Sequence, residues 1–457
     1  MTGDVTVVAG APNEFSPGLI HVKASNELRI TVYFAASIKA EVPMRMLKHF
    51  ALAMLLAGSL IEVHVVQASP GFARQTGMAC NTCHFQHFPA LNAFGRAYKQ
   101  EAYTLKGKQE TIEGENLSIP VNLNIGLVTK MRYLRTNGAD PTSATNTGDI
   151  QFPDEAALLI GGRAGENVGF LVEASLIDSV TSYNSFRIHY NNKASGVNLG
   201  VVPFLTDAGG APYGMELLNT GAQRFIRIAE NRTATAAQQF IRGASGDDRP
   251  GASAATGFAF VASAPQWFAN FTLWHPTFDT SIAHGQFANY FRAAYMPTIG
   301  SWDTAIGVQH FSGSSVAGTG IAVEVDTKAS FVDAQAQGAI GRIPAGLYLT
   351  WGKADGSPAV GTANFFNAQL NDQKAWSVVG EVGVIPNRAT VFVGYLNGDN
   401  GGTSANEDKR ATLGLTWMLA QNMELQIWNT WASGNRYSGA GPATGDNETG
   451  FMLFAGF

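Results

Sequence analysis

The stretch VNLNIGLVTKMRYL, residues 121–134, alternates apolar and polar side chains with a period of two. One set of alternate positions carries Val121, Leu123, Ile125, Leu127, Met131 and Tyr133, and the other carries Asn122, Asn124, Gly126, Lys130 and Arg132. Successive side chains of a β-strand point to opposite faces, so the pattern predicts a strand with one apolar and one polar face. A strand between lipid and a wet lumen needs this division. A strand of a soluble sandwich also alternates, but it buries its apolar face, and periodicity alone does not separate the two.

The connections between strands favour a membrane barrel. Seven further stretches each contain two strands joined by a short turn, at 155–176, 184–202, 256–274, 290–311, 329–352, 376–396 and 410–431, with long polar segments between them. With the first strand and a last one at 449–457, about 16 antiparallel strands are predicted. Short turns then fall at one end and long loops at the other, as in outer-membrane barrels. The segment 204–256 is either a long loop with a helix or two more strands, which would give 18.

The composition agrees with a membrane barrel. Only 14% of the 457 residues are charged, against about 25% in soluble proteins, and there are 51 Gly and 28 Phe. The mean hydropathy of +0.00 argues against several apolar membrane helices, and a net charge of −5 offers no basic surface for nucleic acid. The last strand ends in phenylalanine and resembles the C-terminal signal of bacterial outer-membrane proteins. Tryptophans near predicted strand ends suit aromatic girdles at the two membrane interfaces: Trp274, Trp351, Trp417, Trp428 and Trp431.

The N-terminal region contains an export signal. Basic residues precede an apolar run at 50–61, and small residues suited to cleavage follow at 66–68. We therefore expect a signal peptide at 44–68 and an exported chain that begins near Ser69. Residues 1–43 are interpreted as an extension from an upstream mis-start, and the alternative is a genuine cytoplasmic extension.

The only two cysteines lie in Cys80-Asn81-Thr82-Cys83-His84. Two thiols three positions apart, followed directly by an imidazole, form the C-x-x-C-H attachment motif of c-type haem. We predict one covalent haem c on Cys80 and Cys83, with His84 as the proximal iron ligand. The alternatives are a short-loop disulfide, a thioredoxin-like redox pair and a zinc knuckle. No βαβ setting supports the redox pair, and no second ligand cluster supports the knuckle.

The sixth ligand of the iron stays open. His87, Met78 and the lumen-facing His189 are the candidates. Their alternative roles are, respectively, a packing or hydrogen-bonding histidine, an apolar contact at the haem edge, and a solvated lumen histidine. Arg96 and Lys99 are candidates for pairing with haem propionates, and contact with solvent or headgroups is the alternative.

Four parts of the chain follow from these patterns: the extension 1–43, the signal 44–68, a haem segment 69–117 and a barrel 118–457. A segment of this size rarely builds a sufficient core without help. We therefore predict a small helical c-type haem segment docked in or at the lumen of an all-β transmembrane barrel. An even strand number places both ends of the exported chain in the periplasm.

The segment PGFARQTGMACNTCHFQHFPALNAFGRAYK, residues 70–99, resembles the fused cytochrome–porins of iron-oxidising bacteria. The resemblance rests on 72–77, on the haem motif and on 89–96, while over the barrel it is architectural only. It implies a single-haem segment before an outer-membrane barrel, with electrons passing from extracellular ferrous iron to a periplasmic c-type cytochrome or another carrier. Related fusions serve other donors or acceptors, so the donor is the less specific part of the resemblance.

One haem allows no multihaem wire, so we predict that the segment plugs the lumen with its haem close to both donor and acceptor. Outer-sphere electron transfer needs proximity and a matched potential rather than an acid–base pair, so no catalytic residue is assigned. Asp140, Asp154 and Glu155 are candidate loop carboxylates where ferrous iron pauses, and solvated loop acids are the alternative. The rival functions are a diffusion porin with a structural or sensing haem plug, and the same electron conduit with another donor or acceptor.

Overall fold

The computed structural model describes residues 71–115, 117–138, 146–177, 185–222, 236–241, 254–278, 287–317, 323–438 and 445–457, and the backbone alone at 19–24 and 28–33. The chain forms two compact units, Met1–His64 and Val65–Phe457. In the first unit, β1 (Leu19–Ala24) and β2 (Leu28–Tyr33) form an antiparallel pair within the expected extension. The predicted signal peptide lies outside the described residues, as do the first two residues of the predicted haem segment.

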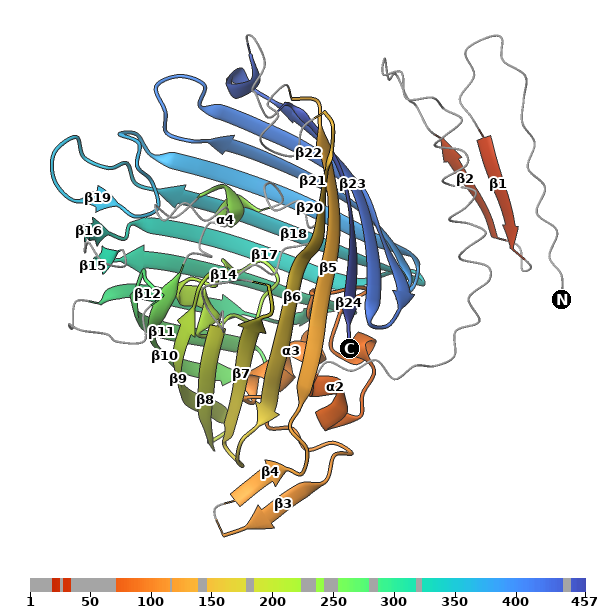
Figure 1. Cartoon of the computed structure of the whole chain (residues 1–457), viewed down its shortest axis with the longest axis vertical. Helices are drawn as coiled ribbons and strands as arrows, with labels where there is room; N and C mark the ends of the chain where they lie inside the picture. The colour runs from red at the N-terminus through yellow and green to blue at the C-terminus, as the bar shows by residue number, and fades with distance from the viewer. Residues whose placement is uncertain are drawn as a thin grey trace. The chain divides into compact units, whose positions relative to one another are not determined.

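The second unit contains a closed antiparallel β-barrel whose described residues form 16 long strands (Figure 1). These are β5 (Ile125–Thr136), β6 (Asp149–Arg163), β7 (Val168–Ser175), β8 (Ser185–Ala194), β9 (Val197–Thr206), β10 (Ala255–Ala264), β11 (Trp267–His275), β12 (Ala288–Tyr295), β14 (Trp302–Ser312), β17 (Ala329–Ile340), β18 (Ile343–Ala354), β20 (Gln373–Ile385), β21 (Ala389–Asp399), β22 (Glu407–Ala420), β23 (Met423–Ser433) and β24 (Asn447–Gly456). The two-residue β13 (Thr298–Ile299) pairs with β14 inside a turn. Each long strand pairs with the next, and β24 pairs with β5 to close the barrel. The predicted number of strands is confirmed, and the seven short turns share one end.

The strands expose apolar side chains on the outer face. In β18, Leu347, Leu349 and Trp351 are 42–43% exposed, whereas Tyr348 and Thr350 between them are 1% and 4% exposed. The same division holds in β5, where the face predicted to be polar is the buried one. The barrel is therefore apolar outside and mixed inside. Among the described residues, no helix is both long enough and apolar enough to cross a membrane.

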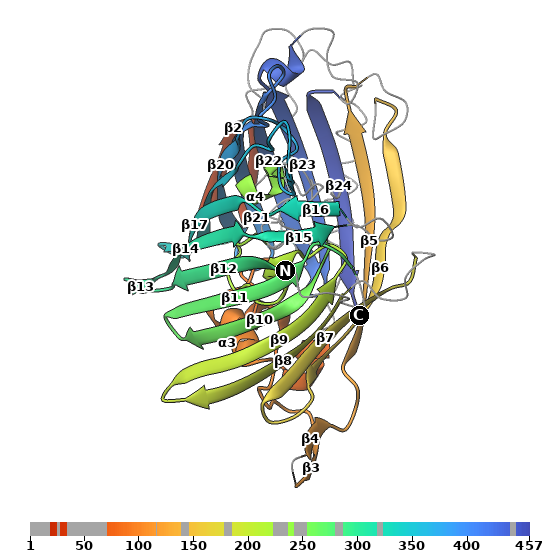
Figure 2. The ribbon, with the colours of Figure 1, turned by 90° about the vertical axis from the view of Figure 1, so that its left-hand side faces the viewer.

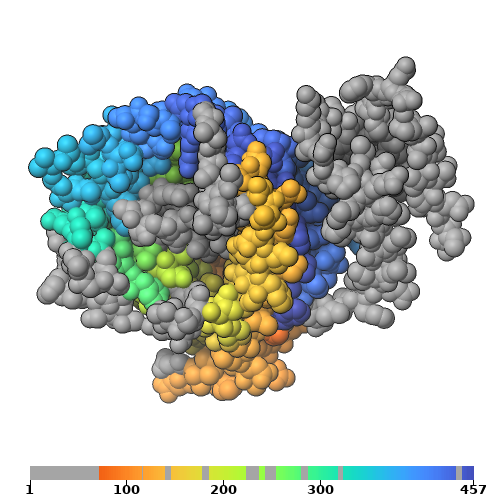
Figure 3. Space-filling model, turned by 45° about the horizontal axis from the view of Figure 1, so that its top comes forward, coloured from red at the N-terminus to blue at the C-terminus, as the bar shows by residue number. Residues whose placement is uncertain are grey.

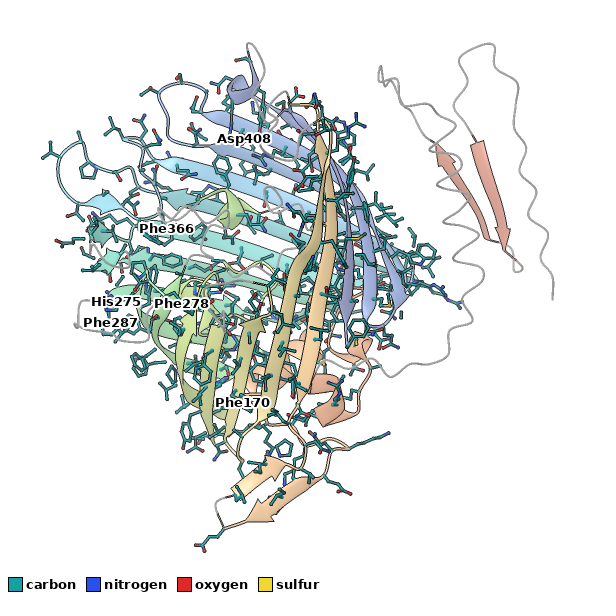
Figure 4. All side chains as sticks on the ribbon, viewed as in Figure 1. Phe170, His275, Phe278, Phe287, Phe366 and Asp408 are labelled. Carbon is teal, nitrogen blue, oxygen red and sulfur yellow. The ribbon has the colours of Figure 1, made fainter. Side chains whose placement is uncertain are left out.

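The connection between β9 and β10 folds into the lumen. Its residues 208–222 and 236–241 are buried and include η2 (Ala211–Tyr213) and α4 (Ala237–Phe240), whereas Asp207, directly after β9, is exposed. The first alternative for 204–256, a loop with a helix, is therefore confirmed for the part that the structure describes. This connection packs into an apolar cluster with the inner faces of the surrounding strands. Phe366, labelled in Figure 4, belongs to this cluster, and its ring contacts Trp274 and Phe311.

Two of the predicted girdle tryptophans do not lie at the membrane interface. Trp274 and Trp428 are each 1% exposed and point into the lumen, whereas Trp351 and Trp431 are outward and 43% and 46% exposed. Position near a strand end does not decide which face a side chain takes. Register decides it, because neighbouring residues point to opposite faces.

A small helical segment lies at the short-turn end. It comprises α2 (Gly71–Thr76), η1 (Cys80–Thr82) and α3 (Ala93–Gln100), and Figure 2 shows α3 against the strands of the barrel. A hairpin of β3 (Thr111–Gly114) and β4 (Leu117–Pro120) follows and projects beyond this end of the barrel (Figure 1). The orange atoms of this part of the chain gather at the lower end of the space-filling view (Figure 3). The long-loop end carries β15 (Ser314–Ala317), β16 (Val323–Asp326), β19 (Ala363–Asn364) and η3 (Asn435–Tyr437).

Candidate functional site

The C-x-x-C-H stretch forms one tight turn at the short-turn end of the barrel. The backbone N–H groups of Cys83 and His84 both donate to the carbonyl oxygen of Cys80, at 3.1 and 3.0 Å. Both cysteines are free thiols and half-buried. The two thiols and the imidazole line one cavity, so the structure brings the three predicted residues together.

Asn92 and Gly95 hold this turn against α3. The side chain of Asn92 accepts from the backbone N–H of Gly95 at 2.9 Å and donates to the carbonyl of Thr82 at 2.9 Å. Its backbone N–H donates to the carbonyl of Cys83 at 3.0 Å. A Cβ atom on Gly95 would lie 2.2 Å from that same carbonyl oxygen, so only glycine permits this approach. The sequence reasoning missed both roles, although an asparagine before a helical run is a recognisable N-cap signal.

The cavity beside the turn has a volume of about 630 Å³, within the range of pockets that hold small molecules and cofactors. Segment residues that include Phe72, Met78 and Tyr98 form one side of it. Strands β5 to β9, with β23 and β24, form the other side. At its far end the cavity reaches Ile177 and Asp207, which lie beyond the long-loop ends of β7 and β9.

Burial sets the protonation of the three motif residues. It raises the pKa of Cys80, and it raises the pKa of Cys83, with a contribution from Cys80, to about 11. Burial lowers the pKa of His84 to about 4, and the backbone of Ala90 and Pro89 opposes that shift only in part. The Nδ1 atom of His84 has no hydrogen bond of normal geometry among the described residues. The imidazole is therefore neutral near pH 7, which is the form that binds a metal.

His87 is a hydrogen-bonding histidine in this structure, which is the role predicted for it as the alternative to a sixth iron ligand. Its Nε2 atom lies 2.7 Å from Oε2 of Glu381 on β20, and its Nδ1 atom lies 2.7 Å from the carbonyl oxygen of Phe88. Burial opposes the charged ring, but the charge and hydrogen bond of Glu381 outweigh it and raise the pKa of His87 to about 9. The His87–Glu381 contact therefore joins the segment to the barrel wall.

The other candidate iron ligands and propionate partners differ in whether they line the cavity. Met78 and Lys99 line the cavity, whereas His189, though 3% exposed on β8, is not part of its lining. Arg96 donates to both carboxylate oxygens of Asp303 on β14, at 2.7 and 2.6 Å, so it ties the segment to the wall instead of facing the cavity.

Two residues expected in outer loops belong to this cavity instead. Asp154 and Glu155 lie on β6, line the cavity and pair with Arg132 and Lys130 of β5, at 2.9 and 2.6 Å. The prediction that they are loop carboxylates is wrong, because β6 starts earlier than the apolar pattern suggested. Asp140 lies outside the described residues.

Two cations lie close together in the lining. The guanidinium of Arg187 donates to the carbonyl of Tyr213 at 2.8 Å and to the hydroxyl of Tyr103. Burial, followed by the charge of Arg187, lowers the pKa of Lys99 well below its usual value, and Glu216 acts in the opposite direction. A nearby anionic group would favour the charged form of Lys99 again, so this part of the cavity is suited to an anionic group.

The segment is anchored around the short-turn end. Gln100 donates to the carbonyl of Ala264 at 2.8 Å, and Gln421 accepts from the backbone N–H of Cys80 at 3.1 Å. Gln86 and Asn387 exchange two hydrogen bonds, of 3.2 and 2.9 Å. Ala264 ends β10 beside one short turn, and Asn387 and Gln421 lie in two others, so the segment contacts the barrel mouth from several sides.

The inward connection holds the segment from within the barrel. Leu91 and Asn219 exchange two hydrogen bonds, of 2.8 and 2.9 Å. Nearby, Arg292 of β12 pairs with Glu216 at 3.0 Å and with Asp333 of β17 at 2.6 Å, and all three side chains are fully buried. This charged triad ties the connection to two strands. Among the described residues, no cluster of three or more His, Cys, Asp or Glu side chains has the arrangement of a metal site.

Solved structures similar to this chain include outer-membrane proteins and porins. No family model matches the sequence, and no curated protein matches it. In-vitro folded OmpT, an outer-membrane protein of Vibrio cholerae, is 11% identical with a TM-score of 0.45, covering 76% of this chain and 100% of its own. A refined porin structure is 12% identical with a TM-score of 0.44, covering 74% and 100%. A mutant of Rh. blastica porin is 12% identical with a TM-score of 0.43 over the same shares. At this level of likeness no function passes from these proteins to this chain.

Proposed function

We propose that the chain carries electrons across a bacterial outer membrane through one haem c, attached to Cys80 and Cys83 and ligated by His84. The observation that carries the proposal is the cavity of about 630 Å³ lined by both thiols and the neutral imidazole of this motif. We take extracellular ferrous iron as the electron donor, on the resemblance of residues 70–99 to fused cytochrome–porins, and a periplasmic c-type cytochrome or other carrier as the acceptor.

The residues present fit a haem group. The two thiols are within one turn of the ligand histidine, as two thioether bonds to one ring require. Aromatic side chains of the segment form an apolar wall, in which Phe72 stacks on Tyr103 with ring centroids 4.7 Å apart. Lys99 and Arg187 are the residues that would neutralise the two propionates, replacing the predicted pair of Arg96 and Lys99.

A bound haem supplies a one-electron redox centre whose potential depends on burial and axial ligation. The protein supplies position and surroundings. The turn fixes the thiols, burial keeps His84 neutral, and the anchoring contacts hold the segment in the barrel mouth. One ferrous ion loses one electron to become ferric, and one oxidised carrier gains that electron. No covalent bond is made or broken and no proton is transferred.

The outward apolar face supports the membrane location. A closed barrel satisfies all backbone hydrogen bonds between its own strands, and an apolar band is then stable against lipid tails. Short turns at one end and long loops at the other support an outer-membrane orientation, with the haem segment and both ends of the exported chain on the periplasmic side.

The attachment is tested by replacing Cys80, Cys83 or both with alanine. Each single variant should retain less haem after denaturing electrophoresis, and the double variant should retain none, because no covalent bond to the ring is left. Haem staining that persists in the double variant would refute the assignment. Purified oxidised protein mixed with ferrous iron should develop the haem α-band, and no reduction at any pH of stability would overturn the proposed donor.

Diffusion of small solutes is the second candidate function, and the closed barrel with its partly polar lumen favours it. Liposomes that contain the haem-loaded protein distinguish the two candidates. An electron carrier plugged by the segment should leave the vesicles impermeable to small sugars. Rapid swelling in sugar solution, with haem present, would instead support a porin with a structural or sensing haem.

A further inference from the structure

The outer face of the barrel changes in ordered steps toward the long-loop ends of β18 and β20, which are neighbours in the wall (Figure 1). The register pairs Trp351 with Trp376, and both rings point outward and are exposed. Two residues further toward the long loops, still on the outer face, Lys353 is paired with Lys374. Aromatic rings and then ammonium groups therefore follow the apolar wall, at the level where lipid tails end and lipid headgroups begin.

The two ammonium groups keep hydrogen-bonding capacity for a ligand. Lys353 pairs with Asp355 at 3.0 Å and with Asp372 at 3.1 Å, and Lys374 pairs with Asp372 at 3.5 Å. All four side chains are between 35% and 55% exposed, and ion pairs this exposed contribute little to stability. An ammonium group has three N–H donors, so Lys374 retains two for a ligand and Lys353 retains one. The aspartates lie on the side of the long loops and the tryptophans on the side of the lipid tails, so an anionic group meets the lysines from the membrane side.

A polar cavity of about 470 Å³ adjoins Lys374 at the long-loop end. It lies between the loop before β20 and the loop after β21, and its lining includes Asn371, Asp399 and Asn406. Asp399 is the register partner of Lys374 on β21, and it accepts from the side chain of Asn406 at 3.0 Å. The hydroxyl groups of a sugar both donate and accept hydrogen bonds, so amide and carboxylate groups around a cavity of this size suit a sugar.

We propose that this outer face binds a glycolipid whose headgroup is a phosphorylated sugar. The phosphate pairs with Lys353 and Lys374, because lysine binds phosphate as a point charge and basic residues at a membrane surface attract anionic headgroups. The sugar enters the cavity beside Asn371 and Asp399, and the acyl chains lie along the apolar wall below Trp376. A phospholipid without a sugar engages the lysines alone. The inference rests on the proposed function for the membrane orientation only, and no step of it involves haem.

Lipids that differ only in phosphate test the contact with the lysines. The purified protein in detergent is titrated with lipid A, a disaccharide lipid that carries two phosphates, and with the same lipid after its phosphates are removed. Native mass spectrometry measures the bound lipid. We expect removal of the phosphates to weaken binding about tenfold or more. Equal binding of the two forms would overturn the proposal.

Substitution of the lysines tests their position. The double variant Lys353→Gln with Lys374→Gln should bind phosphorylated lipid A about tenfold or more weakly and should bind the dephosphorylated lipid as the unchanged protein does. The matched control is Lys106→Gln with Lys193→Gln, which removes two exposed lysines that are also paired with carboxylates, at the short-turn end. The control should bind lipid A normally. Equal affinities of the two double variants would contradict the proposed site.

The variant Asn371→Ala tests the sugar cavity. It should weaken binding of lipid A several-fold and leave binding of phosphatidylglycerol unchanged, because only the sugar reaches this side chain. Equal losses for the two lipids, or no loss, would refute the sugar site. Binding is measured without electron transfer, so the two proposals fail separately. A haem-free protein that binds lipid A as expected would defeat only the proposed function, whereas a haem-loaded protein that binds all these lipids alike would defeat only this inference.

Discussion

Single side chains at the motif have functions that depend on contacts far away in the sequence. Gly95 allows α3 to lie on the carbonyl of Cys83, and a Cβ there would approach that oxygen to 2.2 Å. His87 reaches Glu381, 294 positions further along the chain. Because one contact shapes the turn and the other docks the segment, we expect substitutions to separate attachment of the proposed haem from docking of the segment.

Gly95→Ala should distort the turn and reduce covalent haem. Overpacking of this kind costs about 1–3 kcal/mol, and here the atom in the way is backbone and has little freedom to move. Haem staining after denaturing electrophoresis measures the effect. Gly380→Ala is the matched control, because a Cβ there meets nothing within 4 Å. Full haem content in the Gly95→Ala protein would show that α3 can shift away from the carbonyl of Cys83 without disturbing the turn.

The His87–Glu381 contact should make docking of the segment depend on pH. The pKa of His87 rises from 6.5 to about 9 in the folded protein. A raised pKa gives a stabilisation that is complete below 6.5 and is lost as the pH rises through 9. Protease release of the segment should therefore speed up between these two values, and Glu381→Gln should abolish that dependence. A Glu381→Gln protein with the original pH profile would assign the effect to another group.

Among the elements, the connection between β9 and β10 does most to fill the lumen of the barrel. It fills the barrel with buried residues, and its Asn219 exchanges two hydrogen bonds with Leu91 of the haem segment. The triad of Glu216, Arg292 and Asp333 ties it down. An ion pair buried this deeply is costly to break from one side, since the remaining charges lose their partner.

Arg292→Ala should therefore release the connection and open the lumen. Removing one partner of a buried ion pair costs about 3–5 kcal/mol, and two carboxylates would then face each other without a counter-charge. Single-channel conductance in planar bilayers should rise relative to the unchanged protein. Arg342→Ala, an exposed arginine in the short turn between β17 and β18, is the control and should leave conductance unaltered. An unaltered conductance in both variants would mean that other contacts hold the connection.

The larger unit, Val65–Phe457, is built on a barrel with an apolar exterior and an interior that is largely filled. Its outward strand positions carry leucine, isoleucine, valine and aromatic residues around the circumference. In water such a surface would promote association, whereas in lipid it is the stable surface. This contrast gives a direct test of the membrane location.

Val393→Arg places a charge on the outer face near the middle of β21, where the side chain is 57% exposed. In a bilayer the change should destabilise the barrel by about 2–4 kcal/mol, measured by urea unfolding in lipid vesicles. Val360→Arg, in a long loop and 92% exposed, should have almost no effect. Equal tolerance of both changes would indicate that the outer face of β21 meets water.

Much of this architecture could be predicted from short-range patterns. Alternation with a period of two identified the strands, turn lengths divided the two ends, and the spacing of Cys80, Cys83 and His84 indicated the cofactor. These are local signals, readable because strand geometry and thioether chemistry impose fixed intervals. Register is also local, and it places Trp274 and Trp428 on the inner face although both lie near strand ends.

What the tertiary structure alone decided is which residues meet. Barrel closure brings β24 beside β5 and places Glu381, Asp303 and Asn219 against a segment that precedes them by more than a hundred residues. Asp154 and Glu155, expected in loops, line the cavity instead, and Arg96 pairs with Asp303 on the barrel wall. The sequence predicted a haem motif and determined the strands of a barrel. Their relation to each other required the closed barrel, because contacts between distant residues follow from packing and leave no period or spacing in the chain.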